Sequence, residues 1–89
     1  MNIERLYKKI EDRIKTKTKQ SYTNKLIKLG PKQIAQKFGE ESVELIVDYL
    51  KGSKKRTTEE AADVIYHLLV LLKSKKITLE EIYKELSKR

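Results

Sequence analysis

The sequence predicts an all-α protein folded as an antiparallel helical bundle, on three observations. Apolar residues recur every three to four positions along most of the chain, which is the spacing of one helix face. Gly30-Pro31 and Gly52-Ser53 separate the periodic segments and leave Gly39 as the one glycine inside a segment. Helix-capping patterns precede two of the segments. One domain, residues 1–89, is expected because domains usually have about 100 to 150 residues.

The first predicted helix covers residues 3–15, and its apolar face consists of Ile3, Leu6, Ile10 and Ile14. Residues 16–20 are predicted to form a loop. Ser21 or Thr23 is a suitable N-cap for a short second helix ending at Gly30, because either hydroxyl can accept a hydrogen bond from a free backbone N–H group.

Two long helices are predicted next. Pro31 suits the first turn of the earlier one, which extends to about Leu50 and ends at Gly52. Thr57 and Glu60 form a capping-box pattern, so the later helix is predicted to begin near Thr57 and to continue through the apolar residues 64–72. This later helix is expected to be central and largely buried.

A last helix is predicted after Thr78, because Thr78 and Glu81 repeat the capping-box pattern. Its apolar residues are expected to pack against the other helices. A helical chain this short buries a modest fraction of its surface, so we expect the core to be completed in a homodimer.

Composition excludes several classes of function. The chain contains no cysteine, which excludes disulfides, thiolate metal sites and a cysteine nucleophile. Its longest apolar run, residues 68–72, is too short to cross a bilayer, so we expect a cytoplasmic protein without a membrane partner. The net charge of +8, from 21 basic and 13 acidic residues, favours a polyanionic ligand such as a nucleotide.

The acidic residues form two short clusters beside apolar positions. Glu40, Glu41 and Glu44 lie on the first long helix, and Glu60 and Asp63 lie on the second. If these helices pack antiparallel, as their short connection favours, the clusters converge on one pocket. Hard divalent cations prefer oxygen ligands, so the sequence predicts a Mg²⁺ site, with Mn²⁺ as a substitute.

The alternative for either cluster alone is a solvated helix face or a set of partners for lysines one turn away, and this is the commoner outcome for a single cluster. Two clusters on successive helices, each bordering apolar surface, favour the metal site.

The spacing of these acids resembles that of the all-α NTP pyrophosphohydrolase (MazG-like) superfamily. Within it, nearly the whole chain is similar to phosphoribosyl-ATP pyrophosphohydrolases of histidine biosynthesis, through Ser21-Tyr22-Thr23, Lys25-Leu26, Gly30, Lys37-x-Gly39-Glu40-Glu41, Glu60-Ala61-Ala62-Asp63 and Tyr66-His67-Leu68-Leu69. The resemblance implies a MazG-like bundle that hydrolyses phosphoribosyl-ATP to phosphoribosyl-AMP and pyrophosphate. It also implies metal ligands at Glu41, Glu44, Glu60 and Asp63, with Glu40 as a further ligand, a supporting group or the base for the attacking water.

Five further residues are candidates for binding substrate. Lys37, one turn before Glu41, and Lys25 could contact phosphate, although either could equally be a solvated surface charge. Tyr22 and Thr23 belong to the resembling motif and could contact ribose or phosphates, although Thr23 could simply cap a helix. His67 continues the Glu60 and Asp63 face, although a hydrogen-bonded core histidine is the commoner outcome. Tyr66 is expected to pack in the core.

Two features depart from the pattern of the resembling family: the acid at Asp48 and the basic segment of residues 52–58. We expect both to lie apart from the core motif.

Two other functions remain open. A related enzyme that hydrolyses other nucleoside triphosphates would share the metal motif but lack the residues around Tyr22 and His67. A basic helical nucleic-acid-binding module would explain the net charge and Lys54-Lys55-Arg56, but it would not explain the acids beside apolar surface. We therefore expect no nucleic-acid partner.

Overall fold

The computed structural model describes residues 1–16 and 21–89, which form five α-helices and no strand. The helices are α1 (Ile3–Thr16), α2 (Tyr22–Leu29), α3 (Pro31–Lys51), α4 (Lys54–Ser74) and α5 (Leu79–Leu86). The all-α prediction is confirmed. The predicted loop lies mostly at residues 17–20, outside the described residues, and Thr16 belongs to α1.

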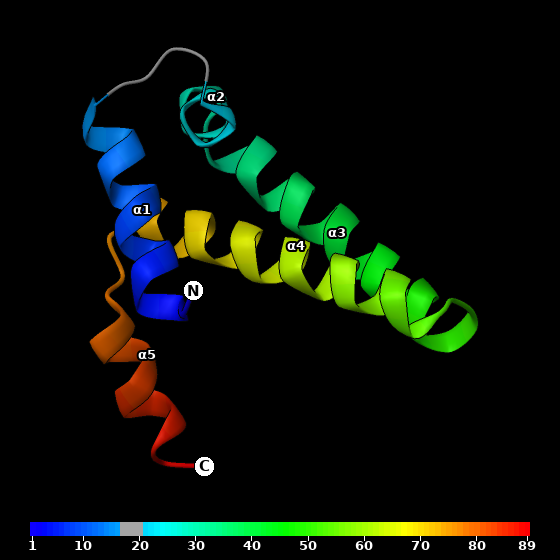
Figure 1. Ribbon diagram of the computed structural model, residues 1–89. Helices are drawn as coiled ribbons and strands as arrows, with labels where there is room; N and C mark the ends of the chain where they lie inside the picture. The colour runs from blue at the N-terminus through cyan, green and yellow to red at the C-terminus, as the bar shows by residue number, and fades with distance from the viewer. Residues whose placement is uncertain (17–20) are drawn as a thin grey trace.

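A long antiparallel hairpin of α3 and α4 dominates the structure (Figure 1). Helix α1 crosses the C-terminal end of α4, and α2 lies across the beginning of α3. Helix α5 projects away from the hairpin (Figure 1), and the expectation that its apolar residues pack against the other helices is confirmed for Leu79 and Ile82 but wrong for Leu86. Only its first residue, Leu79, is buried, while Leu86 near its end is exposed.

The helix ends follow local side-chain chemistry. Ser21 rather than Thr23 caps α2, since its hydroxyl accepts a hydrogen bond from the backbone N–H of Asn24. Gly30 has a φ of 97°, which a residue with a Cβ rarely adopts, and this glycine makes the sharp turn from α2 into Pro31. The predicted capping box of Thr78 and Glu81 is confirmed.

The predicted start of α4 near Thr57 is wrong, because the helix begins at Lys54 with Ser53 as its N-cap. Thr57 lies within the first turn, and its hydroxyl donates to the backbone oxygens of Asp48 and Ser53. The carboxyl of Glu60 reaches the α3–α4 interface instead of the backbone of Thr57.

The hydrophobic core lies where α1, α2 and α5 meet the hairpin. Its buried members are Ile10, Leu26, Ile34, Leu69, Val70, Leu72 and Leu79. Helix α4 supplies three of them, consistent with its expected central place, although Ile65 and Leu68 on the same helix remain exposed. No described helix has the length and apolar content needed to cross a bilayer. Because this core lies at one end of the hairpin, the other half of the hairpin extends beyond it and can carry polar groups between α3 and α4.

Candidate metal centre

Three of the predicted acidic residues meet between α3 and α4. Glu41 on α3 and Glu60 and Asp63 on α4 each place a carboxylate oxygen within 4.8 Å of the others. Glu41 and Glu60 are 8% and 5% exposed, whereas Asp63 faces solvent. The antiparallel hairpin thus brings the two acidic clusters together, with two carboxyls inside the helix interface and one at its edge.

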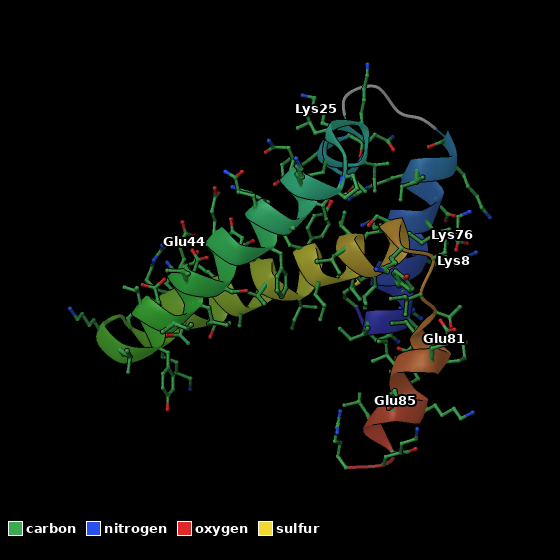
Figure 2. All side chains as sticks on the ribbon, turned by 180° about the vertical axis from the view of Figure 1, so that it is seen from behind. Lys8, Lys25, Glu44, Lys76, Glu81 and Glu85 are labelled. Atoms are coloured by element: carbon green, nitrogen blue, oxygen red, sulfur yellow. The ribbon has the colours of Figure 1, made fainter. Side chains whose placement is uncertain are left out.

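The other two acids occupy different places. Glu44 is exposed on the next turn of α3 (Figure 2), and its carboxyl lies close enough to Glu60 to affect that group's ionisation. Glu40 is also exposed, and its carboxyl accepts a hydrogen bond from Gln36 and lies 3.8 Å from the ammonium of Lys37. The structure therefore places Glu44 at the edge of the centre and directs Glu40 along the outside of α3.

Glu60 has the most perturbed electrostatics in the centre. Burial is the main cause that raises its pKa from 4.5 to about 7, followed by hydrogen bonding to Glu41 and Glu44 and repulsion from both. While Glu60 is ionised, its Oε2 atom is buried without a hydrogen-bond donor, because its acidic neighbours offer none. A buried carboxylate oxygen in this condition calls for a proton or a cation.

Each buried carboxyl has a basic residue one turn earlier on its own helix. The ammonium of Lys37 lies 3.4 Å from Glu41, and the guanidinium of Arg56 lies 3.4 Å from Glu60. Because the helices are antiparallel, these two cations lie at opposite ends of the cluster. The negative charge that Tyr22 carries when its phenol is ionised, and next the hydrogen bond to Glu41, raise the pKa of Lys37, so this lysine also adjoins α2.

Lys25 is not brought to the cluster. Lys25 lies on α2, and Figure 2 shows it well separated from Glu44 on α3. Its side chain is exposed. The structure shows no contact between Lys25 and the described acids of the centre, so its phosphate contact stays a prediction.

Tyr22 and His67 form a chain of hydrogen bonds that ends at Asp63. The His67 ring is 6% exposed, and its Nδ1 atom lies 2.7 Å from the backbone oxygen of Asp63. A carbonyl only accepts, so Nδ1 carries the proton and Nε2 accepts from the Tyr22 hydroxyl at 2.9 Å. Both ring nitrogens are thus occupied by protein partners, which is the commoner outcome for such a histidine.

Thr23 is fully buried, and its hydroxyl forms a hydrogen bond with the hydroxyl of Tyr66. Its side chain therefore offers no surface to a substrate and instead connects α2 to α4. Tyr66 packs against the core as expected.

Arg56 is the residue near the centre that the sequence did not identify. Its position four residues before Glu60 is the only local signal, and Arg56 is equally part of the basic run Lys54-Lys55-Arg56. Asp48, expected to lie apart from the motif, also contacts this guanidinium at 3.8 Å. A separate groove of about 780 Å³ lies between α1, the end of α4 and α5. Its lining contains none of the acids of the two predicted clusters.

The residues present fit a hard divalent cation. The donor set consists entirely of carboxylates, two of them buried, and the Glu60 Oε2 atom has no protein partner. Mg²⁺ and Mn²⁺ prefer oxygen ligands, and Mg²⁺ usually keeps several waters, which the exposed side near Asp63 allows.

The chain is similar to known proteins over nearly its whole length. The chain is 49% identical over 87 residues to a phosphoribosyl-ATP pyrophosphatase of Sulfolobus acidocaldarius, covering 98% of this chain and 92% of that protein. It is 47% identical to the corresponding protein of Saccharolobus solfataricus, with 98% and 93% covered. It is 45% identical to that of Cereibacter sphaeroides, with 98% and 84% covered. A family model matches residues 3–89, and the chain belongs to the phosphoribosyl-ATP pyrophosphohydrolase family.

Proposed function

We propose that this chain hydrolyses phosphoribosyl-ATP to phosphoribosyl-AMP and pyrophosphate, a step of histidine biosynthesis, using Mg²⁺ bound between α3 and α4. Family membership supports the substrate and the reaction. The observation that carries the metal-dependent mechanism is the buried, partnerless Oε2 atom of Glu60 beside Glu41 and Asp63. Glu44 lies close enough to Glu60 to serve as a fourth carboxylate ligand.

When bound, Mg²⁺ neutralises triphosphate charge and makes a coordinated water more acidic. The protein residues supply the ligands and their orientation. Glu41 and Glu60 are fixed between two packed helices, so their carboxylates change little in position when the cation arrives. Lys37 places a positive charge at the α2 side of the cluster, where it can meet the charge that develops on a leaving phosphate group.

Three other candidate residues receive more specific roles. Tyr22 is half exposed beside Lys37 and is the best placed residue of α2 to contact substrate. His67 orients Tyr22 through its Nε2 atom. Glu40 orients Lys37 from the outer face of α3, which favours a supporting role over a base. Contact between Lys25 and phosphate remains a prediction, as does a cytoplasmic location.

A second copy of the chain is proposed to cover the outer face of α3. Val43, Ile46, Val47 and Leu50 are each at least half exposed, and their spacing places them on one face of the helix, opposite α4. A stripe of this kind on a small helical protein is typical of an interface. We therefore propose the homodimer as the working form.

The alternative functions lose support. A pool-cleansing triphosphatase would share the acids but not the match of residues 3–89 to the phosphoribosyl-ATP family. A nucleic-acid-binding module would need Arg56 available for phosphates, whereas its guanidinium lies among three carboxylates.

The decisive experiment measures pyrophosphate release from phosphoribosyl-ATP, ATP and dUTP, with Mg²⁺ and with EDTA. We expect release from phosphoribosyl-ATP that disappears with EDTA and in Glu60→Gln. Glu85→Gln removes an equal charge on α5, where Glu85 pairs only with Lys88 among described residues, and should retain activity. Release confined to ATP or dUTP would refute the substrate, and release that survives EDTA would refute the metal dependence.

A further inference from the structure

Arg56 connects the two helices of the hairpin beside the acidic centre. One guanidinium nitrogen, Nη2, lies 3.4 Å from Glu60 Oε1 and 3.8 Å from Asp48 Oδ2. The other, Nη1, lies 3.8 Å from Glu59 Oε1. A single side chain of α4 thus contacts one of the two buried acids and also an acid of α3.

Asp48 is well placed to hold this guanidinium. Its backbone oxygen accepts hydrogen bonds from the N–H of Gly52, which caps the end of α3, and from the hydroxyl of Thr57, which joins that end to the beginning of α4. A Cβ at Gly52 would lie 2.8 Å from Asp48 Oδ1, so the glycine leaves room for the carboxylate. The Asp48 side chain is only 19% exposed.

The two oxygens of Glu60 have different surroundings. Oε1 faces Arg56, and Oε2 is buried without a partner. A glutamate side chain has three rotatable bonds, and a charge-assisted contact to one oxygen restricts the orientation of the other. We infer that Arg56 is a positioning residue, which together with Asp48 occupies Oε1 of Glu60 and so presents Oε2 to the metal. This inference rests on the metal site proposed above.

The direction of the effect distinguishes positioning from simple electrostatics. A positive charge near a cation site repels the cation, so charge alone predicts that removing Arg56 tightens metal binding. Positioning predicts the opposite, because an unrestrained Glu60 must be ordered when the metal binds. Residues that orient metal ligands typically contribute about 10- to 100-fold in affinity. Arg56 is more than half exposed, so we expect a loss near tenfold, at the lower end of that range.

The test is a titration of the metal-free protein with Mn²⁺ in the absence of nucleotide. Mn²⁺ affinity is measured by calorimetry and by the electron paramagnetic resonance signal of free Mn²⁺. Arg56→Gln should bind about tenfold more weakly than the unmodified protein. Arg56→Lys keeps the charge but replaces the planar guanidinium, whose Nη2 atom reaches both Glu60 and Asp48, with an ammonium on a flexible stem, and should show a smaller loss. Asp48→Asn should weaken binding in the same direction. Lys55→Gln is the matched control, since it removes an equal charge from the adjacent residue, for which no described acid lies within ion-pair distance.

Binding by Arg56→Gln that equals or exceeds binding by Lys55→Gln would overturn the inference while leaving the metal site intact. Failure of the unmodified protein to bind Mn²⁺, or binding that is unaffected by Glu60→Gln, would overturn the metal site itself and the inference with it. Thermal unfolding of each metal-free variant checks the fold, and a tenfold loss in a variant with unchanged unfolding supports positioning.

Discussion

His67 gives a direct test of the geometry beside the acidic centre, because it is the only histidine in the chain. The hydrogen bonds predict one tautomer, with the proton on Nδ1 shared with the backbone oxygen of Asp63 and with Nε2 accepting from Tyr22. The ¹⁵N resonances of a single imidazole can be assigned without ambiguity. We expect the Nδ1–H tautomer at neutral pH, both before and after addition of Mg²⁺.

The perturbation is Tyr22→Phe, which removes the hydroxyl at 2.9 Å from Nε2 and leaves the rest of the ring in place. A buried acceptor left without a donor costs about 1 to 3 kcal/mol. Tyr22 is partly exposed and water can reach the position, so we expect about 1 kcal/mol, the lower end of that range. For a domain of this size, that loss lowers the melting temperature by about 4 to 8 °C.

The assay is urea and thermal unfolding at fixed protein concentration, with Tyr49→Phe as control. Tyr49 is exposed on α3, and its hydroxyl has no hydrogen-bond partner among the described residues, so its loss should have little effect. Equal stability of the two variants would refute the proposed role of Tyr22 in satisfying His67. An Nε2–H tautomer, or a shift of the Nε2 resonance to a metal-bound value on adding Mg²⁺, would refute the assignment of His67 as an orienting residue.

Three further predictions concern the acids, the outer face and the core. The pKa of Glu60 is raised from 4.5 to about 7 in the folded protein. Between pH 4.5 and about pH 7 the folded state therefore binds more protons than the unfolded state. The metal-free protein should lose stability as the pH rises through this range. Glu60→Gln should remove this loss, measured as unfolding midpoints from pH 4 to 8, and an unchanged pH dependence would contradict the assignment. Val47→Glu places a charge in the exposed stripe of α3 and should convert the proposed homodimer to a monomer in light scattering; an unaltered mass would refute an interface on this stripe. Val70→Ala removes two methyl groups from a fully buried position and should cost about 2 to 3 kcal/mol in urea unfolding, whereas a loss below about 1 kcal/mol would mean that this part of the core is loosely packed.

Local patterns predicted the parts of this fold that depend on neighbours in sequence. Ser21, Gly30 and the capping box at Thr78 each act within a few residues, and each helix end that they mark is found in the structure. The start of α4 was missed because Ser53 and Thr57 are both acceptable caps. The choice between them depends on the hairpin, which draws the Thr57 hydroxyl to Asp48 and the Glu60 carboxyl into the helix interface.

The acidic centre could be predicted in outline because two helices joined by a short turn must run antiparallel. That argument identifies facing segments but not the rotation of each helix. It could not separate Glu41, which is buried, from the adjacent Glu40, which faces outward. Contacts between residues far apart in sequence were equally out of reach, and the bond between Tyr22 and His67 spans 45 positions.

The placement of charge in the hairpin argues for function over stability. At Glu41 and Glu60, a hairpin selected only for packing would carry apolar side chains, as it does at Ile34 and Leu69 near the core. Instead it buries two carboxyls against each other, each accompanied by a cation one turn away, Lys37 or Arg56. Those cations offset part of the repulsion without entering the space between the acids, and the Oε2 atom of Glu60 stays without a partner. Burying a polar atom in this way costs free energy unless a ligand satisfies it. A divalent cation satisfies it and joins the two helices, so metal binding should stabilise the same part of the hairpin that the acids weaken.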